Sequence, residues 1–288
     1  MKKFASFVAS VLACASLFAA IVPAYAAGAE APKIAVETVE APVVAENDKA
    51  LVDYTHASDG YIEVEYKEET TSKLKCQVAS NDGAVYTYNL KPGKRETFSL
   101  TCGAGCYKVT VFRGLGGSKY TTVFTTEVSA AIQDVSAVYL NSNQYVDWKG
   151  AEASVAKAAE LCQGLTMDQE KINAVYNYVI SNLTYDREKA ATVQSGYLPV
   201  IDDILTKKTG ICFDYAALMA GMLRSQGVPC KLVVGNVGGA QVRHAWVQVY
   251  ANGQWTRMDP TFASSGKGSA SIMQYIGNGE NYQDLYFY

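Results

Sequence analysis

Between residues 51 and 131 the chain alternates apolar and polar positions in short runs. In residues 61–67 (YIEVEYK), Ile62, Val64 and Tyr66 fall on one face of an extended chain and charged side chains fall on the other. Similar runs cover residues 74–78, 85–90, 97–100, 107–112 and 121–128. Turn sequences such as NDG and KPG separate them. Six or seven short strands at this spacing predict a small antiparallel β-sandwich over residues 49–132.

After about residue 133 the apolar period changes from two to 3.6, which predicts helices. We expect helices over residues 151–165, 167–182 (with Thr166 as the N-cap) and 200–206. The run 210–223 (GICFDYAALMAGML) is apolar on nearly all sides, as in a helix buried within a domain. The change of period predicts a second, α+β domain over residues 133–288, with its own core.

A hairpin is predicted where Asn252-Gly253 joins two strand-like segments, residues 242–250 and 254–259. With these two residues as the loop, Tyr250 lies opposite Trp255 and Trp246 lies opposite Asp259. His244 is then the diagonal neighbour of Asp259 on the same face, about 7–8 Å away at the backbone. A register slip of one residue would put these two side chains on opposite faces.

Composition narrows the class of protein. The 288 residues are 49% hydrophobic and 18% charged, with a formal net charge of −3. This is typical of a globular chain, and it gives no basic excess that would favour nucleic acid as a partner. The chain has two histidines, so a reaction that needs an imidazole has two candidates.

The first 26 residues read as a signal peptide. Lys2 and Lys3 precede an apolar run, and Ala24-Tyr25-Ala26 supplies a small-x-small cleavage pattern. We therefore expect export, to a secreted or cell-surface location, with no stable membrane insertion after cleavage. Residues 27–48, rich in Ala, Val, Pro and Glu, predict an extended spacer.

Six cysteines follow the signal segment: Cys76, Cys102, Cys106, Cys162, Cys212 and Cys230. Their spacing shows no repeated C-x-x-C pair and no histidine at zinc-finger distance, and the sequence has no EF-hand calcium loop. We expect neither a metal nor another cofactor. Export would permit disulfides, and the sequence leaves their pairing open.

Cys212 is expected in the first turn of the buried helix, where free N–H groups and the helix dipole favour a thiolate. Cys212, His244 and Asp259 are then the parts of a thiol acyl-transfer site: a nucleophile, a general base and a carboxylate that orients the imidazole. Taken singly, Cys212 could be a small core residue, His244 a half-buried strand residue, and Asp259 a turn residue before Pro260.

These residues also carry a resemblance. Gly210-Ile211-Cys212-Phe213-Asp214-Tyr215-Ala216, His244-Ala245-Trp246 and Asp259-Pro260-Thr261 resemble the core of the bacterial transglutaminase-like superfamily, over about residues 135–288. The resemblance implies a papain-like thiol-enzyme fold, with Cys212 as nucleophile, His244 as general base and Asp259 as orienter. No motif identifies the side-chain oxyanion donor, for which Tyr185, Tyr197 and the Trp246 indole are candidates.

The expected function is a secreted cysteine enzyme that attacks an amide carbonyl of a glutaminyl side chain or peptide through a thioester. The sequence does not decide between hydrolysis and transfer to an amine. The expected partner is a protein or peptide substrate, a cell-envelope polymer among the options, and the β domain would position the enzyme on it. The alternative is an inactive transglutaminase-like scaffold that serves as a cell-surface binding module.

Overall fold

A computed structural model describes residues 42–238, 242–264 and 281–288 of the chain. The predicted signal peptide, most of the predicted spacer and two internal segments lie outside these residues. The described residues all belong to one compact unit. Within the described residues, no helix is long and apolar enough to cross a bilayer.

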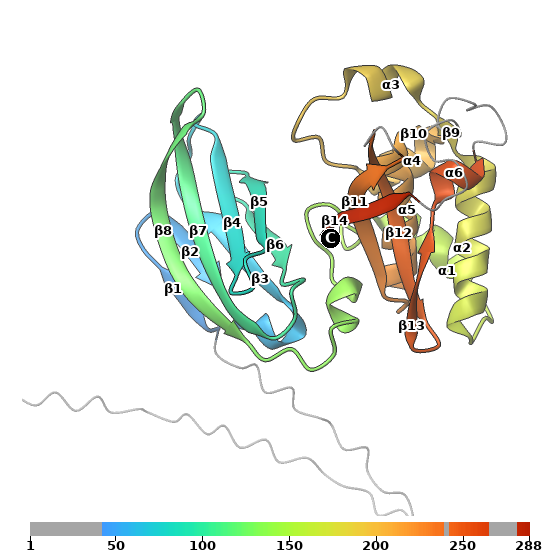
Figure 1. Ribbon diagram of the computed structural model, residues 1–288, viewed down its shortest axis with the longest axis horizontal. Coiled ribbons are helices and arrows are strands. Elements are labelled where there is room, and N and C mark those ends of the chain that lie inside the picture. Colours follow the sequence, from blue (N-terminus) through green and yellow to red (C-terminus); the bar gives the residue numbers. More distant parts are fainter. Residues whose placement is uncertain (1–41, 239–241, 265–280) are drawn as a thin grey trace, which may run out of the picture. The chain divides into compact units, whose positions relative to one another are not determined.

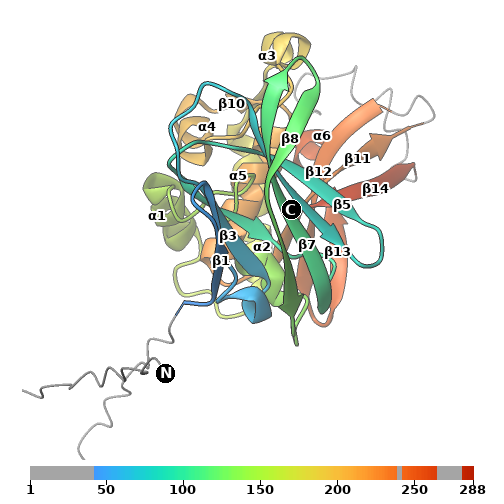
Figure 2. The ribbon, with the colours of Figure 1, turned by 90° about the vertical axis from the view of Figure 1, so that its left-hand side faces the viewer.

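The N-terminal part consists of two four-stranded antiparallel sheets (Figures 1 and 2). One has the order β1-β2-β3-β6 and the other β5-β4-β7-β8. Their strands are β1 (Val44–Glu46), β2 (Ala50–Asp53), β3 (Tyr61–Tyr66), β4 (Leu74–Ser80), β5 (Val85–Leu90), β6 (Arg95–Ser99), β7 (Gly105–Gly116) and β8 (Lys119–Ala130). The antiparallel β architecture predicted for this part is confirmed.

The burial of β3 follows the period-two pattern of its sequence. Ile62, Val64 and Tyr66 are fully buried, whereas Glu63 and Glu65 between them are partly exposed. Burying one such face is what holds a sheet against its partner layer.

Strand β1 lies within the segment expected to be a spacer. Val44–Glu46 pairs antiparallel with Leu51–Asp53 of β2. Its side chains are mostly exposed, so backbone hydrogen bonds rather than apolar burial hold it. The sequence therefore carried no hydrophobic alternation that could reveal this strand.

The C-terminal part combines helices with a four-stranded antiparallel sheet of order β13-β12-β11-β14. The sheet strands are β11 (Cys230–Val237), β12 (Val242–Ala251), β13 (Gln254–Met258) and β14 (Tyr282–Phe287). A two-stranded parallel pair joins β9 (Thr184–Tyr185) to β10 (Thr209–Gly210). The helices are α1 (Glu152–Leu161), α2 (Asp168–Asn182), α3 (Arg187–Thr192), α4 (Ile201–Lys207), α5 (Cys212–Ser225) and α6 (Pro260–Ser264). Short 3₁₀ turns occur at η1 (Ala57–Asp59), between β2 and β3, and at η2 (Ala137–Leu140), before α1.

Helix α5 is central to this part. Every residue from Asp214 to Arg224 is buried, and α5 packs against α1, α2, α4 and strands β11 and β12. The prediction of a buried helix with Cys212 in its first turn is confirmed. The helix ends near Gly227, whose φ of 78° is left-handed and is readily adopted by glycine.

The boundaries of α1 and α2 differ from the sequence prediction for identifiable reasons. Helix α1 ends at Leu161 rather than at residue 165, because Gly164 adopts a left-handed φ of 77° just beyond it. Helix α2 has Met167, not Thr166, at the N-cap, where the Glu170 carboxylate accepts a hydrogen bond from the Met167 N–H at 3.4 Å. The glutamate at the third helical position satisfies this donor, so a hydroxyl at the cap is dispensable.

Two large hydrophobic clusters form, one in each part of the chain. The N-terminal cluster includes Val138 and Tyr139 from the junction, while Tyr145 and Tyr288 pack against both clusters. The Gln144 side chain donates hydrogen bonds to the Asn89 carbonyl at 2.7 Å and to Glu96 at 2.9 Å. The junction thus joins the two parts through aromatic packing and polar contacts. The domain limits proposed from the sequence stay a prediction.

Candidate active site

The hairpin that carries His244 and Asp259 has the predicted register. Tyr250 pairs with Trp255, and Asn252 and Gly253 have left-handed φ values of 54° and 77°, as a tight two-residue turn requires. Asp259 follows the last residue of β13 and precedes Pro260, the first residue of α6. Its carboxylate accepts a hydrogen bond from the Phe262 N–H at 2.8 Å, so it also caps this helix.

His244 and Asp259 form a buried pair. His244 Nε2 lies 2.7 Å from Asp259 Oδ2, and the two residues are 6% and 9% exposed. Cys212 and His244 line the same cavity, and Cys212 lies near enough to the imidazole to raise its pKa. The imidazole therefore lies near both a thiol and a carboxylate, and the three residues named from the sequence meet at one place.

The charges of this group are coupled. Burial disfavours a charged His244, but the hydrogen bonds with Asp259 and Cys212 outweigh it and raise the pKa of His244 from 6.5 to about 10. Burial likewise opposes ionisation of Asp259, yet hydrogen bonds from His244, Phe262 and Tyr282 hold its pKa below the usual 3.8. The imidazolium and the carboxylate stabilise each other.

Cys212 opens into a cavity of about 350 Å³. Apart from His244 and Arg243, most of the lining is apolar or aromatic: Tyr185, Ala190, Val193, Ile211, Phe213, Val234 and Ala245. All of these residues belong to the C-terminal part of the chain. A thiol beside an imidazole in such a cavity can act as a nucleophile on a bound carbonyl carbon.

The three candidate oxyanion donors have different surroundings. Tyr185 lines the cavity, and burial together with the nearby Cys212 raises its pKa to about 12, so it stays a protonated donor. The Tyr197 hydroxyl donates instead to Asp214 Oδ1 at 2.6 Å. The Trp246 indole N–H is buried without a hydrogen-bond partner among the described residues, and its ring packs on Tyr282.

Tyr282 is a site residue that the sequence reasoning missed. Its hydroxyl donates to Asp259 Oδ2 at 2.7 Å, the same oxygen that faces His244. Tyr282 comes from β14, which pairs with β11 on the side away from β12. No spacing in the sequence relates it to Asp259, because the contact depends on the strand order of the sheet.

The six cysteines among the described residues are all free. Cys76, Cys162 and Cys230 are buried, whereas Cys102, Cys106 and Cys212 are partly exposed. Across the described parts of the chain, no group of three or more His, Cys, Asp and Glu side chains could hold a metal ion.

Residues 155–260 match the family model of the transglutaminase-like superfamily. The chain therefore contains a transglutaminase-like domain. The match spans α1 to the start of α6 and includes Cys212, His244 and Asp259. The expected fold class, a β-rich N-terminal region followed by a transglutaminase-like α+β domain, is confirmed.

Individual relatives match only part of this chain. The kyphoscoliosis peptidase of Mus musculus is 30% identical over 116 residues, which are 37% of this chain and 17% of that protein. The uncharacterised protein YebA of Bacillus subtilis is 30% identical over 120 residues, covering 34% of this chain and 16% of its own length. The chain thus spans less than a fifth of either relative.

Among solved structures, red sea bream transglutaminase aligns with a TM-score of 0.31 and 14% identity, over 70% of this chain and 48% of its own. This likeness is too distant to bear on function. The match to the superfamily model, by contrast, supports the assignment of this domain to a family of thiol enzymes.

The substitution Tyr282→Phe tests whether the Tyr282 hydroxyl stabilises the ionised Asp259 carboxylate. Loss of the hydroxyl removes one hydrogen bond to a buried carboxylate, so we expect the free energy of unfolding to fall by about 1–2 kcal/mol. The pKa of Asp259 should rise, because one cause of its lowering is gone. The acid limb of the pH profile for Cys212 alkylation should then move to higher pH. An unchanged acid limb would contradict this role.

Proposed function

We propose that the protein is a cysteine enzyme that cleaves an amide bond through a thioester. Cys212 Sγ attacks the carbonyl carbon, and the positive charge on His244 stabilises the thiolate before attack. As the carbon–nitrogen bond breaks, His244 gives its proton to the departing amine, which leaves the acyl group on sulfur. Asp259 orients the imidazole throughout.

The observation that carries this proposal is the surroundings of His244. A buried imidazole that contacts a carboxylate at 2.7 Å and shares a cavity with a thiol has the arrangement expected of a base that is held by an orienting group. The superfamily match to the same residues gives independent support.

The acyl acceptor decides the overall reaction. With water the neutral His244 would activate the second nucleophile and the product would be a carboxylate; with a primary amine the product would be a new amide. The peptidase name of the mouse relative favours a peptide substrate. The test is a panel of glutaminyl peptides with and without a primary amine, with released ammonia and new amide measured separately.

Selective labelling tests the nucleophile itself. We expect iodoacetamide at pH 6 to modify Cys212 faster than Cys102 or Cys106, the other two partly exposed thiols, because only Cys212 contacts an imidazolium. Burial raises the pKa of Cys102 and, to about 12, that of Cys230, which slows both further. Peptide mass spectrometry over time gives each rate. Equal rates at Cys106 and Cys212 would favour the inactive binding scaffold.

We also propose that the protein is exported and that its β domain acts outside the chemical step. Residues 1–26 have the signal pattern described above. All residues that line the cavity lie between positions 185 and 245, so none comes from the β domain. Binding of the β domain to a protein or cell-envelope polymer would raise the local concentration of substrate without altering catalysis.

A further inference from the structure

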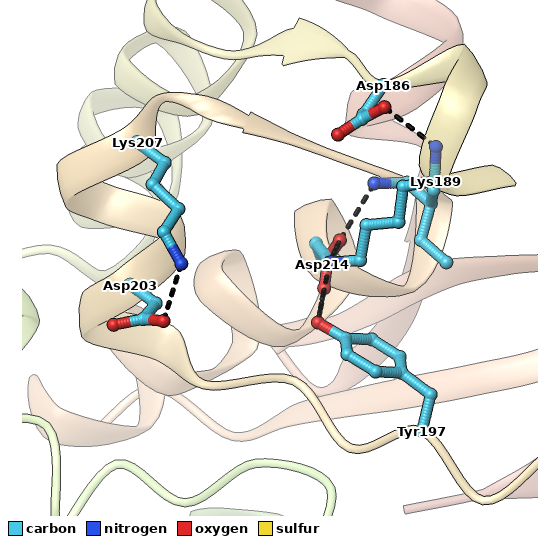
Figure 3. Close-up of polar contacts among 7 residues, drawn as sticks. Asp186, Lys189, Tyr197, Asp203, Lys207 and Asp214 are labelled. Atoms are coloured by element: carbon cyan, nitrogen blue, oxygen red, sulfur yellow. Dashed lines mark hydrogen bonds and ion pairs between the residues drawn. The ribbon is translucent and has the colours of Figure 1, made fainter. Parts of the chain in front are cut away.

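A second polar cluster lies beside the candidate site and has no part in the chemistry described above. Asp214, two residues after Cys212, is completely buried. Lys189 Nζ donates to its Oδ2 at 2.6 Å, and the Tyr197 hydroxyl donates to its Oδ1 at 2.6 Å. Figure 3 shows Lys189 and Tyr197 reaching Asp214 from different segments.

The same carboxylate is attached to the start of α5. Asp214 Oδ2 accepts a hydrogen bond from the Ile211 N–H at 2.8 Å. A Cβ at position 210 would lie 2.5 Å from the Asp214 Cβ, so glycine at this position permits the close approach. Asp214 is therefore fixed to the helix that carries Cys212, and Lys189 and Tyr197 are fixed to Asp214.

The segment held in this way forms part of the cavity wall. Ala190 and Val193, which line the cavity, lie between Lys189 and Tyr197 in the sequence. Helix α3 has six residues and none of them is buried. A helix this short has little stability of its own, and here it has no apolar face to anchor it. The two bonds to Asp214 therefore restrain Ala190 and Val193, together with the Asp186 N–H, which donates to the Gly210 carbonyl at 2.9 Å, and the Asp186 carboxylate, which accepts from the Lys189 N–H at 2.8 Å.

We propose that Lys189 and Tyr197 are positioning residues that, through Asp214, hold residues 186–197 in place as the apolar wall that binds the acyl donor. This inference rests on the proposed function, since it assigns the cavity beside Cys212 to substrate. It names the substrate class more closely: the group next to the attacked carbonyl carries apolar surface that packs on Ala190 and Val193.

The test compares two alkylating reagents at Cys212. Iodoacetamide is small and can reach Cys212 without contacting Ala190 or Val193. Iodoacetanilide carries a phenyl ring that would pack on these two residues. For Tyr197→Phe and Lys189→Met we expect the half-saturation constant KI for iodoacetanilide to rise by about three- to tenfold, as expected for a weakened apolar contact surface. The maximal rate kinact and the iodoacetamide rate should change by less than about twofold, since Cys212 and His244 are untouched.

Lys207→Met is the matched control. Lys207 pairs with Asp203 at 2.7 Å on α4, and both side chains are more than half exposed (Figure 3). Removing this cation should leave KI unchanged. Lys189→Arg keeps the positive charge and should have a KI close to the wild-type value. If only Lys189→Met has a raised KI, the effect comes from the lost bond to Asp214 and not from any substitution at this position.

Two outcomes would overturn the assignment. An unchanged KI in folded Tyr197→Phe and Lys189→Met would show that the bonds to Asp214 do not hold the wall. A fall in the iodoacetamide rate that matches the change with iodoacetanilide would show that the cluster acts on the nucleophile instead. Failure of the proposed function has a different signature: alkylation of Cys212 that does not respond to substitution of His244.

Discussion

Replacement of His244 with glutamine is expected to slow the alkylation of Cys212 at pH 6 by about 10- to 100-fold. At pH 6 an ordinary thiol with a pKa near 8.5 is only about 0.3% ionised. In the wild-type protein the pKa of His244 is raised to about 10, so at pH 6 a positive charge lies beside the attacking sulfur. Glutamine fills similar space and can donate to Asp259, but it carries no charge.

The effect of His244 protonation should weaken as the pH rises. Its contribution to the free energy of unfolding is complete below about pH 6.5 and is lost as the pH rises through about 10. The positive charge beside Cys212 is lost over the same rise in pH. The rate ratio between wild type and His244→Gln should therefore be largest near pH 6 and should shrink toward alkaline pH, where an ordinary thiol ionises unaided. The measurement is the second-order iodoacetamide rate at Cys212 from pH 5 to 10.

His56→Gln provides the control, since it removes the other histidine of the chain. His56 lies in the β domain, where its half-exposed ring contacts Asp59 at 2.9 Å. Its replacement should leave the Cys212 rate unchanged at every pH. A His244→Gln profile that overlies the wild-type profile would show that Cys212 gains nothing from the imidazole, and the proposed mechanism would fail.

Gly235→Ala is expected to lower the free energy of unfolding by about 2–3 kcal/mol and the melting temperature by roughly 5–10 °C. A Cβ on this residue of β11 would overlap the backbone carbonyl oxygen of Gln283 and lie 2.5 Å from Trp246 Cη2. A backbone atom in a paired strand cannot move as a flexible side chain would. Strand β14 must shift, and with it Tyr282, whose hydroxyl donates to Asp259.

The functional consequence separates this substitution from general destabilisation. If β14 shifts, Gly235→Ala should change the acid limb of the Cys212 alkylation profile in the same direction as Tyr282→Phe. Gly150→Ala is the comparison, because a Cβ there would meet only the Asp147 side chain at 3.3 Å. It should alter the free energy of unfolding by less than about 0.5 kcal/mol. A Gly235→Ala protein with wild-type stability would contradict the close packing of β14 on β11.

The sequence alone determined much of the fold because several signals were local. Alternation in residues 61–67 placed Ile62, Val64 and Tyr66 in the core, where they are fully buried. The continuous apolar run after Gly210 identified α5, and the Asn-Gly turn established the register that puts His244 and Asp259 on one face. In each case a few neighbouring residues decide the backbone geometry.

Strand β1 and helix α3 escaped the sequence analysis for a physical reason. Neither buries an apolar face: β1 is held by pairing with β2, and α3 by the bonds of Lys189 and Asp186. Periodicity detects an element through the side chains that it buries. An element that is stabilised by backbone pairing or by a few polar side-chain contacts leaves no such period.

The surroundings of the three candidate catalytic residues depended on tertiary structure. Tyr282 reaches Asp259 only because β14 pairs with β11, although 23 positions separate the two residues in the sequence. Lys189 and Tyr197 reach Asp214 across 25 and 17 positions. The register of a hairpin is determined by a few residues at its turn, so the sequence could reveal that His244 and Asp259 lie on the same face. Strand order and loop anchoring depend on the packing of the whole domain, so the groups that hold this pair and the cavity wall in place emerge only in the folded chain.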